Sequence, residues 1–170
     1  MHNDFLILFS PLVLRMISNK YITAHYRCPD LIGGVRTTTE FELSVNGTSK
    51  DLLDAISVLA SQNVNLDTIA TGKTDDRFVV KFLTGNEEEC RRTFMKADLP
   101  FKERRVLVMD MNNRPGQWMK AAKCIVNAGV ELQASYLYSV QGDRMRFVFC
   151  VDDYEKAKKV AGQIAECAAD

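Results

Sequence analysis

The chain has 170 residues, enough for one domain or two small ones. Hydrophobic residues make up 46% and charged residues 26%, close to the averages of globular proteins, which excludes a disordered or collagen-like chain. The 22 Lys and Arg residues balance 22 Asp and Glu residues, so no broad basic field is available to attract nucleic acid or anionic lipid.

Cysteines and histidines give little support to a catalytic or metal site. The five cysteines lie far apart without a C-x-x-C pair, a pattern typical of reduced thiols in the cytoplasm. Both histidines, His2 and His25, precede the segments that have strand or helix patterns. We therefore expect no catalytic residue, no metal and no cofactor, and a cytoplasmic location.

Residues 1–35 are predicted to form an N-terminal extension. Their apolar run, residues 5–14, is shorter than the roughly 20 residues that span a bilayer. It also lacks the cationic start and the cleavage site of a secretion signal. We expect no membrane contact. The segment either docks on the folded part of the chain or lies upstream of an internal start such as Met16.

Strand and helix patterns begin near position 37. Residues 41–45 alternate like a strand, and a helix capped by Thr48 or Ser49 follows. Two more strand patterns, 64–72 and 78–83, precede a second helical run at 87–97 and a further extended stretch. The order is β-α-β-β-α-β. The first helix has the apolar stripe of a surface helix with one buried face, formed by Leu52, Ala55, Ile56, Leu59 and Ala60.

The same order occurs a second time from residue 105. A strand pattern at 105–111 leads through a loop into a helix with the stripe Trp118, Ala121, Ala122, Ile125 and Val126. Trp118, Ala121 and Val126 each stand 66 positions after the matching residue of the first helix, so the chain contains an internal repeat. Strand patterns at 131–140 and 145–151 and a helix at 152–168 complete the second copy, which lacks a clear last strand.

Units of this order form a ferredoxin-like sandwich, so the predicted fold class is α+β with two ferredoxin-like repeats. We predict repeat 1 at 36–104 and repeat 2 at 105–170, with their sheets side by side. Another segment is expected to cover the sheet edge that the missing last strand leaves open, and residues 21–26 are the candidate.

Several predicted strands are apolar on both faces. In residues 106–111 Leu107, Met109 and Met111 alternate with Val106 and Val108, and residues 145–150 alternate in the same way. A sheet that is apolar on both faces needs a layer over each. We therefore predict a homo-oligomer, in which a second copy of the chain packs back to back on the face without helices.

The loop between the first strand and helix of repeat 2 has the chemistry of a ligand site. A proline at the first helical position has its φ already set, and a glycine beside it lets a ligand approach the backbone. Free N–H groups at a helix start can hold a carboxylate, and an arginine offers a bidentate partner. The alternative is that Pro-Gly only starts the helix and Asn113 only caps it. The predicted ligand residues here are Asn112, Asn113, Arg114, Pro115, Gly116 and Gln117.

The motifs of both repeats resemble those of the ACT domain, a small regulatory module that binds amino acids. The resemblance covers residues 37–167 and rests on RPGQ at 114–117, VDDYEKA at 151–157 and VNL at 64–66. It implies that two modules lie side by side and bind the ligand at their seam. Asn65 and Asp67 would then face the loop, with Asp67 accepting the ammonium group, although a solvated turn explains both residues equally well.

Repeat 1 departs from this motif at one place. Its loop, NGTSK at 46–50, has no Pro-Gly, so we predict one strong site per chain.

The leading functional prediction is a non-catalytic sensor that binds a free amino acid between the two repeats. Its expected partners are other copies of the chain and a regulated enzyme or transcription factor. The alternative is an RNA-recognition-like module, because that fold has the same topology. The neutral charge, and a strand MRFVFC that lacks that family's motif, argue against nucleic acid as a partner.

Overall fold

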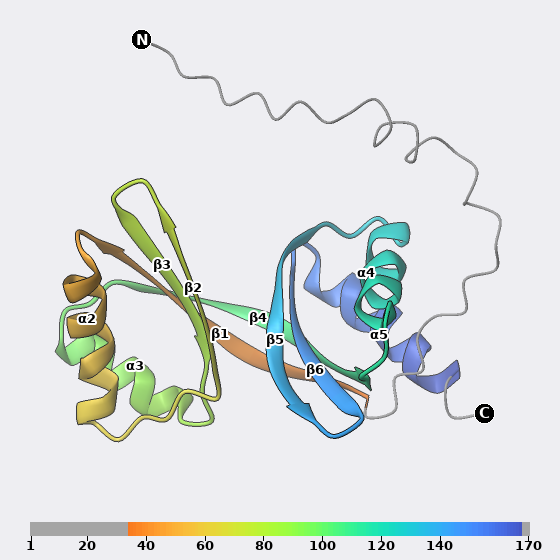
Figure 1. Ribbon diagram of the computed structural model, residues 1–170, viewed down its shortest axis with the longest axis horizontal. Helices are drawn as coiled ribbons and strands as arrows, with labels where there is room; N and C mark the ends of the chain where they lie inside the picture. The colour runs from red at the N-terminus through yellow and green to blue at the C-terminus, as the bar shows by residue number, and fades with distance from the viewer. Residues whose placement is uncertain (1–33, 168–170) are drawn as a thin grey trace, which may run out of the picture.

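The computed structural model describes residues 34–167 (Figure 1). Six strands and four helices follow the predicted order, so both β-α-β-β-α patterns are confirmed. The elements are β1 (Val35–Asn46), α2 (Ser49–Ser61), β2 (Thr68–Thr74), β3 (Arg77–Leu83), α3 (Glu87–Lys96), β4 (Phe101–Asn112), α4 (Gln117–Asn127), β5 (Leu132–Gln141), β6 (Arg144–Val151) and α5 (Tyr154–Cys167).

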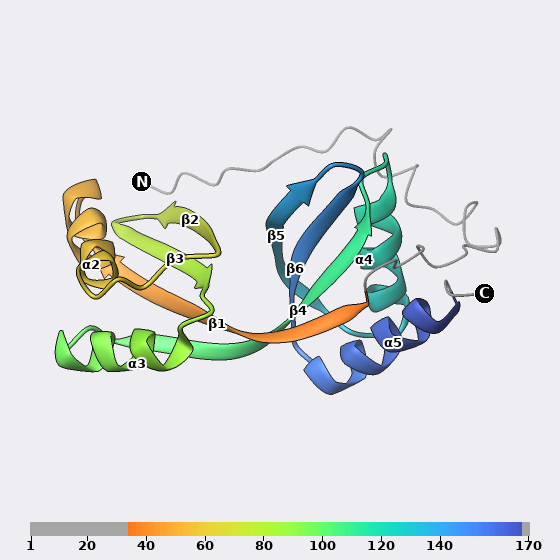
Figure 2. The same cartoon turned by 90° about the horizontal axis from the view of Figure 1, so that it is seen from below.

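All six strands belong to one sheet with the order β2-β3-β1-β4-β6-β5, and every neighbouring pair is antiparallel. Strands β1 and β4 have 12 residues each and run through both halves of the molecule (Figure 2). Helices α2 and α3 lie with one half, and α4 and α5 lie with the other. The predicted pair of ferredoxin-like repeats, side by side, is confirmed.

The two repeats share their central strands. Strand β4 is the last strand of repeat 1 and the first of repeat 2, so the predicted boundary at 104/105 lies within it. Residues 35–39 of β1 pair with residues 105–109 of β4 and take the place of the missing last strand of repeat 2. The candidate for that place, residues 21–26, lies outside the described residues.

A pseudo-two-fold axis passes through the pair formed by Thr39 and Arg105. These residues face each other in the β1–β4 register, and they are also 66 positions apart, the offset of the sequence repeat. Each position of β1 therefore has a counterpart on β4, and the two counterparts lie at equal distances from the axis. Where the two counterpart residues differ in type, the two halves of the molecule differ at that position.

Each half has a core between its helices and the sheet. In the first half, Phe41, Phe82 and Phe94 are fully buried with Leu59. In the second, Leu107, Met109 and Phe149 pack with Ile125. The predicted stripes are confirmed at Ala55, Leu59, Ala121, Ala122 and Ile125, which are all buried.

The prediction was wrong for Ala60, which is exposed, and for Trp118 and Val126, whose side chains are 38% and 53% exposed. The buried stripe of α4 runs through Gln117, Ala121 and Ile125, at steps of four residues, so Trp118 lies to one side of it. Its indole N–H reaches across to β5 and donates to the hydroxyl of Ser135 at 2.9 Å.

The face of the sheet without helices is covered by the protein itself. The sheet coils until β2 approaches β5, where the hydroxyl of Thr68 donates to the carbonyl of Leu137 at 3.0 Å. The apolar side chains on this inner face form a third core with Tyr136 and Tyr138, and its buried members are Leu83, Val106, Val108, Val148 and Cys150. A second copy is therefore not needed to bury this face, contrary to the back-to-back packing expected above. Oligomerisation stays a prediction.

No helix within residues 34–167 is both long and apolar enough to cross a bilayer.

Two leucines of α2 provide a matched test of the first core. Leu59 is 1% exposed and Leu53 is 67% exposed. We expect Leu59→Ala to lower the free energy of unfolding by about 2–5 kcal/mol, because it leaves a cavity. Leu53→Ala should stay within about 0.5 kcal/mol of wild type. Urea denaturation of both variants measures this, and equal losses would contradict the orientation of α2.

Candidate functional site

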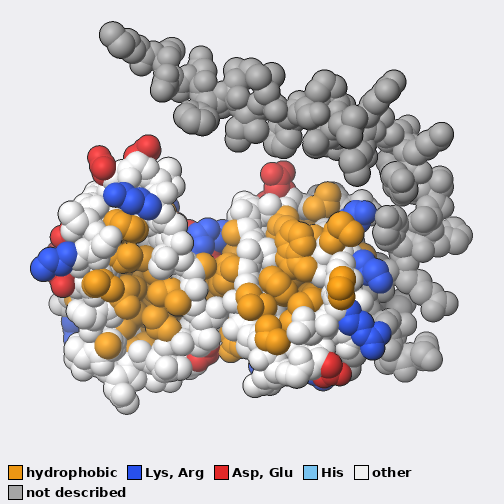
Figure 3. Space-filling view, in the orientation of Figure 1, with side chains coloured by type: hydrophobic (Ala, Val, Ile, Leu, Met, Phe, Trp, Pro, Cys, Tyr) orange, Lys and Arg blue, Asp and Glu red, His pale blue; other side chains and the backbone are white. Residues whose placement is uncertain are grey.

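A cavity of about 760 Å³ lies between the two halves. The first half contributes the β3–α3 loop, the start of α3 and Asp67, and the second contributes Val108 and Tyr138. The first residues of β1, which complete the sheet of the second half, form another wall. The lining residues are Arg36, Thr37, Thr38, Asp67, Leu83, Thr84, Gly85, Asn86, Glu87, Glu88, Glu89, Arg91, Val108 and Tyr138. Figure 3 shows the seam between the halves, where charged side chains are visible between two areas of hydrophobic side chains.

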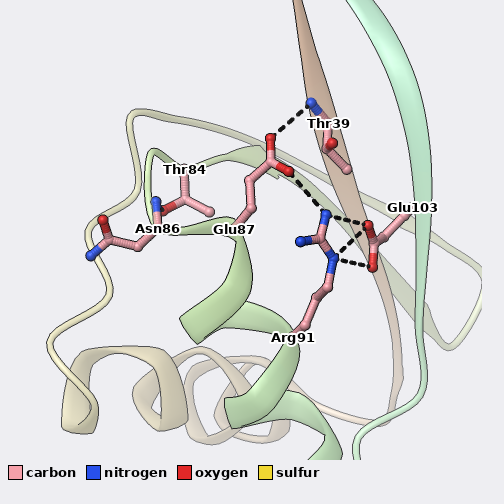
Figure 4. Close-up of polar contacts among 6 residues, drawn as sticks. All are labelled: Thr39, Thr84, Asn86, Glu87, Arg91 and Glu103. Carbon is pink, nitrogen blue, oxygen red and sulfur yellow. Dashed lines mark hydrogen bonds and ion pairs between the residues drawn. The ribbon is translucent and has the colours of Figure 1, made fainter.

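A network of charged side chains fastens α3 to the edge of β1 (Figure 4). The carboxylate of Glu87 accepts the backbone N–H of Thr39 at 3.3 Å. The guanidinium of Arg91 bridges Glu87 at 2.9 Å and Glu103 of β4 at 2.8 Å. Burial acts to raise the pKa of Glu87, but the hydrogen bonds from Thr39 and Arg91 outweigh burial and hold this pKa below its usual range.

The turn after β3 positions Asp67. The hydroxyl of Thr84 donates to the carbonyl of Asn65 at 2.7 Å and accepts the backbone N–H of Asn86 at 3.1 Å. The backbone N–H of Asp67 donates to the carbonyl of Leu83 at 2.9 Å. These bonds hold the Asp67 carboxylate at the wall of the cavity, where the amide of Asn65 donates to it at 3.4 Å.

The cavity wall presents one basic and two acidic side chains that are open to a ligand, namely Arg36, Asp67 and Glu88. Of the other charged lining residues, Arg91 pairs with both Glu87 and Glu103, and Glu89 pairs with Arg92. Arg36 has no ion pair within residues 34–167, and Asp67 has only the long bond from Asn65. Thr38 and the phenol of Tyr138 add uncharged polar groups. Such a surface suits a small molecule that carries both an anionic and a cationic group.

An ion pair with a fully buried carboxylate and a partly exposed guanidinium lies on the other side of the axis. The carboxylate of Glu40, which is 0% exposed, accepts Nε of Arg104 at 2.5 Å and the hydroxyl of Tyr136 at 2.6 Å. The thiol of Cys150 donates to the same carboxylate at 3.1 Å. Burial and the neighbouring Glu40 together raise the pKa of Tyr136 and that of Cys150, so both groups remain protonated.

The counterpart residues explain why the halves differ. Arg104 is 66 positions after Thr38, and Gln133 is 66 positions after Asp67. Arg104 reaches Gln133 at 3.3 Å and so spans the space that corresponds to the cavity. In the first half a threonine stands at that position, and the space stays open.

The loop at 112–117 lies at the end of β4, away from the cavity. Its first helical residue is Gln117, so Pro115 does not begin the helix as expected. Gly116 is the residue before the helix, with φ of +83°, a left-handed conformation that favours glycine. No side chain caps α4, so Asn113 does not act as its cap. The backbone N–H of Asn113 donates to the carbonyl of Asp143 at 2.6 Å.

One feature of this loop keeps it a candidate ligand site. Gln117 is 9% exposed, and its side-chain oxygen has no hydrogen-bond partner. The loop and Asn65 with Asp67 are not brought together within one chain, because no loop residue lines the cavity and no hydrogen bond or ion pair joins the two sets within residues 34–167.

Sequence reasoning missed most of the cavity. Arg36, Tyr138 and Glu87 come from segments far apart in the chain that meet only because the sheet coils. Their only sequence signal was the 66-residue offset, which pairs Thr38 with an arginine and so marks an asymmetry between the repeats. Within the described residues no group of three His, Cys, Asp or Glu side chains is placed to hold a metal ion.

Known proteins share the fold but not the sequence. No family model and no curated protein matches the chain. Protein BT0572 from Bacteroides thetaiotaomicron has a similar structure, with a TM-score of 0.68 and 15% identity over 78% of this chain and 98% of that one.

Two further structures come from aspartate kinases. The ligand-free regulatory subunit of the Thermus thermophilus enzyme gives a TM-score of 0.53 with 12% identity, covering 77% of this chain and 97% of that one. A chain from the aspartokinase alpha and beta subunits gives a TM-score of 0.55 with 12% identity, covering 80% and 97%. At such identities the likeness establishes the fold, a mixed α+β arrangement that regulatory subunits of aspartate kinase also adopt.

The ion pair of Glu40 and Arg104 allows a test of the asymmetric interior. Glu40→Ala should lower the free energy of unfolding by about 3 kcal/mol, because Arg104 loses its counter-charge. The double change Glu40→Ala with Arg104→Met should recover at least half of that loss, since no unpaired charge remains. Urea denaturation of the single and double variants measures the coupling. A single-variant loss under about 1 kcal/mol would show that the Glu40 carboxylate is not buried.

The buried thiols provide a test by chemical labelling. Burial raises the pKa of both Cys90 and Cys150 to about 12, so neither forms the reactive thiolate at pH 8. We expect iodoacetamide to leave both unlabelled in native protein and to label both in urea, as measured by peptide mass spectrometry. Stability should also decline as the pH rises above about 9, because the thiols ionise only in the unfolded chain. Rapid native labelling of Cys150 would contradict its burial.

Proposed function

We propose that this protein is a non-catalytic regulatory protein that binds a free amino acid in the cavity between its two repeats. The observation that carries the proposal is the cavity itself, with Arg36 and Asp67 open to ligand charges of opposite sign on its walls. An amino acid has a carboxylate and an ammonium group, which these two side chains complement. The ligand state would pass to other copies of the chain or to a regulated enzyme or transcription factor.

Two further observations support this proposal. The cavity lies where residues of both repeats meet, so a ligand there contacts both halves. It can therefore favour one arrangement of the two halves over another. Its counterpart is spanned by Arg104, which favours one such site per chain. The regulatory subunits of aspartate kinase have the same fold, and the sequence motifs resemble ACT domains, whose ligands are amino acids.

The loop at 112–117 is the competing location for the ligand. The uncapped start of α4 and the unpaired oxygen of Gln117 could hold the two charged groups of an amino acid. Asn112, Asn113 and Arg114 would then orient it. Asn65 and Asp67 could complete this site only from another copy, because within one chain they belong to the cavity region.

The geometry does not favour the RNA-recognition-like alternative. Such modules bind RNA by stacking bases on aromatic side chains of an open sheet face. Here Tyr136 and Tyr138 lie in the inner core against the other half of the sheet. Apart from the cavity that Tyr138 lines, the coiled sheet covers this face, so it offers no open aromatic surface for stacked bases.

A thermal-shift screen against the twenty amino acids tests the proposal. A ligand at 100 times its dissociation constant should stabilise the wild type by about 2.7 kcal/mol. Arg36→Gln and Asp67→Asn should each remove most of the shift, because each removes one charge partner. Asp76→Asn, in the exposed β2–β3 turn, is the matched control and should leave the shift unchanged.

Gln117→Leu separates the two locations. If the cavity is the site, this variant keeps the shift. If the loop is the site, Gln117→Leu loses the shift while Arg36→Gln keeps it. A wild type that none of the twenty amino acids stabilises would refute the proposed function.

A further inference from the structure

We propose that the main chain of Thr37, on an unpaired edge of β1, holds the α-amino and α-carboxylate groups of the ligand. The site would then select α-amino acids as a class by their common atoms. This inference rests on the proposed function and names the main-chain groups that bind the ligand.

The edge of β1 is open where it borders the cavity. Strand β3 pairs with β1 only over residues 41–46. On that side no strand of the described chain pairs with residues 35–39, which have β4 on their other side. The backbone N–H of Thr39 points to the open side, because it donates to the carboxylate of Glu87.

The main chain of Thr37 points the same way. Along a strand the N–H and C=O groups of alternate residues face the same neighbour, so Thr37 repeats the orientation of Thr39. No strand or side chain within residues 34–167 forms a hydrogen bond with the N–H or the C=O of Thr37. Arg36, Thr37 and Thr38 all line the cavity, so these two groups face the space where a ligand would sit.

An α-amino acid matches this pair of groups. In a hydrogen-bonded antiparallel pair, two residues exchange both of their N–H···O bonds. A free amino acid can form the same ring, since its ammonium group donates to the carbonyl of Thr37 and its carboxylate accepts the N–H. A β-amino acid has one more carbon between these groups and fits the ring poorly. Arg36 and Asp67 would add charge complementarity from the walls.

The side chain of Thr37 takes no part in these hydrogen bonds to the ligand. Its hydroxyl lies 2.5 Å from the phenol oxygen of Tyr154 on α5, on the helix side of the sheet. A change of side chain that keeps the N–H should therefore leave the site intact, whereas proline removes the N–H. Proline is compatible with an edge position whose N–H faces away from the neighbouring strand.

Isothermal titration with Thr37→Pro and Thr37→Val tests the inference. The probe is the amino acid that gives the largest shift among the twenty. We expect Thr37→Pro to bind at least tenfold more weakly than wild type and Thr37→Val to bind within twofold. A folded Thr37→Pro variant that binds within twofold of wild type would overturn the inference while leaving the proposed function intact.

A ligand analogue provides the second measurement, on wild-type protein, and decides the matter if Thr37→Pro does not fold. The one-carbon-longer β-homologue of the same probe should bind at least tenfold more weakly, because its ammonium and carboxylate groups no longer match the spacing of the Thr37 N–H and C=O. Equal affinity for the β-homologue would overturn the inference. If wild type binds none of the twenty amino acids, the proposed function fails first, and this inference fails with it.

Discussion

The antiparallel pairing of β1 with β4 is the constraint on which the rest of the structure depends. Each of these strands belongs to both repeats, so neither half has a complete sheet without the other. The shared pair also sets the symmetry axis at Thr39 and Arg105. Because both strands are long and strongly twisted, the outer strands β2 and β5 come around until they approach each other (Figures 1 and 2). The face of the sheet without helices is then enclosed inside the protein.

The symmetry of the backbone is broken by side chains at one pair of counterpart positions. Arg104 in one half reaches both Glu40 and Gln133, and so occupies the space next to it. Thr38 in the other half is too short to do so, and a cavity remains. A buried carboxylate needs a partner of opposite charge, so Glu40 and Arg104 have to be considered together. The same duplication therefore produces one filled half and one open half.

Among residues 34–167, the open half also has a strand edge whose main-chain groups are only partly hydrogen-bonded. The carboxylate of Glu87 accepts the N–H of Thr39, as a neighbouring strand would. The main-chain groups of Thr37 face the cavity. A ligand that resembles one residue of a strand would complete the edge. Backbone recognition of this kind depends on the shape of the fold and leaves little trace in residue types.

Periodicity and the 66-residue offset were sufficient to predict the order of elements, the duplication and the α+β class. These features depend on local patterns, such as the stripe of Ala55 and Leu59, that the chain carries in consecutive turns of helix or strand. Local patterns could not show that β1 begins at Val35 and completes repeat 2, that Trp118 lies off the buried stripe, or that the inner face is covered by the same chain. Those outcomes, and the meeting of Arg36, Asp67 and Tyr138 at one cavity, depend on contacts between residues tens of positions apart. They were decided only when the sheet coiled and brought its two outer strands together.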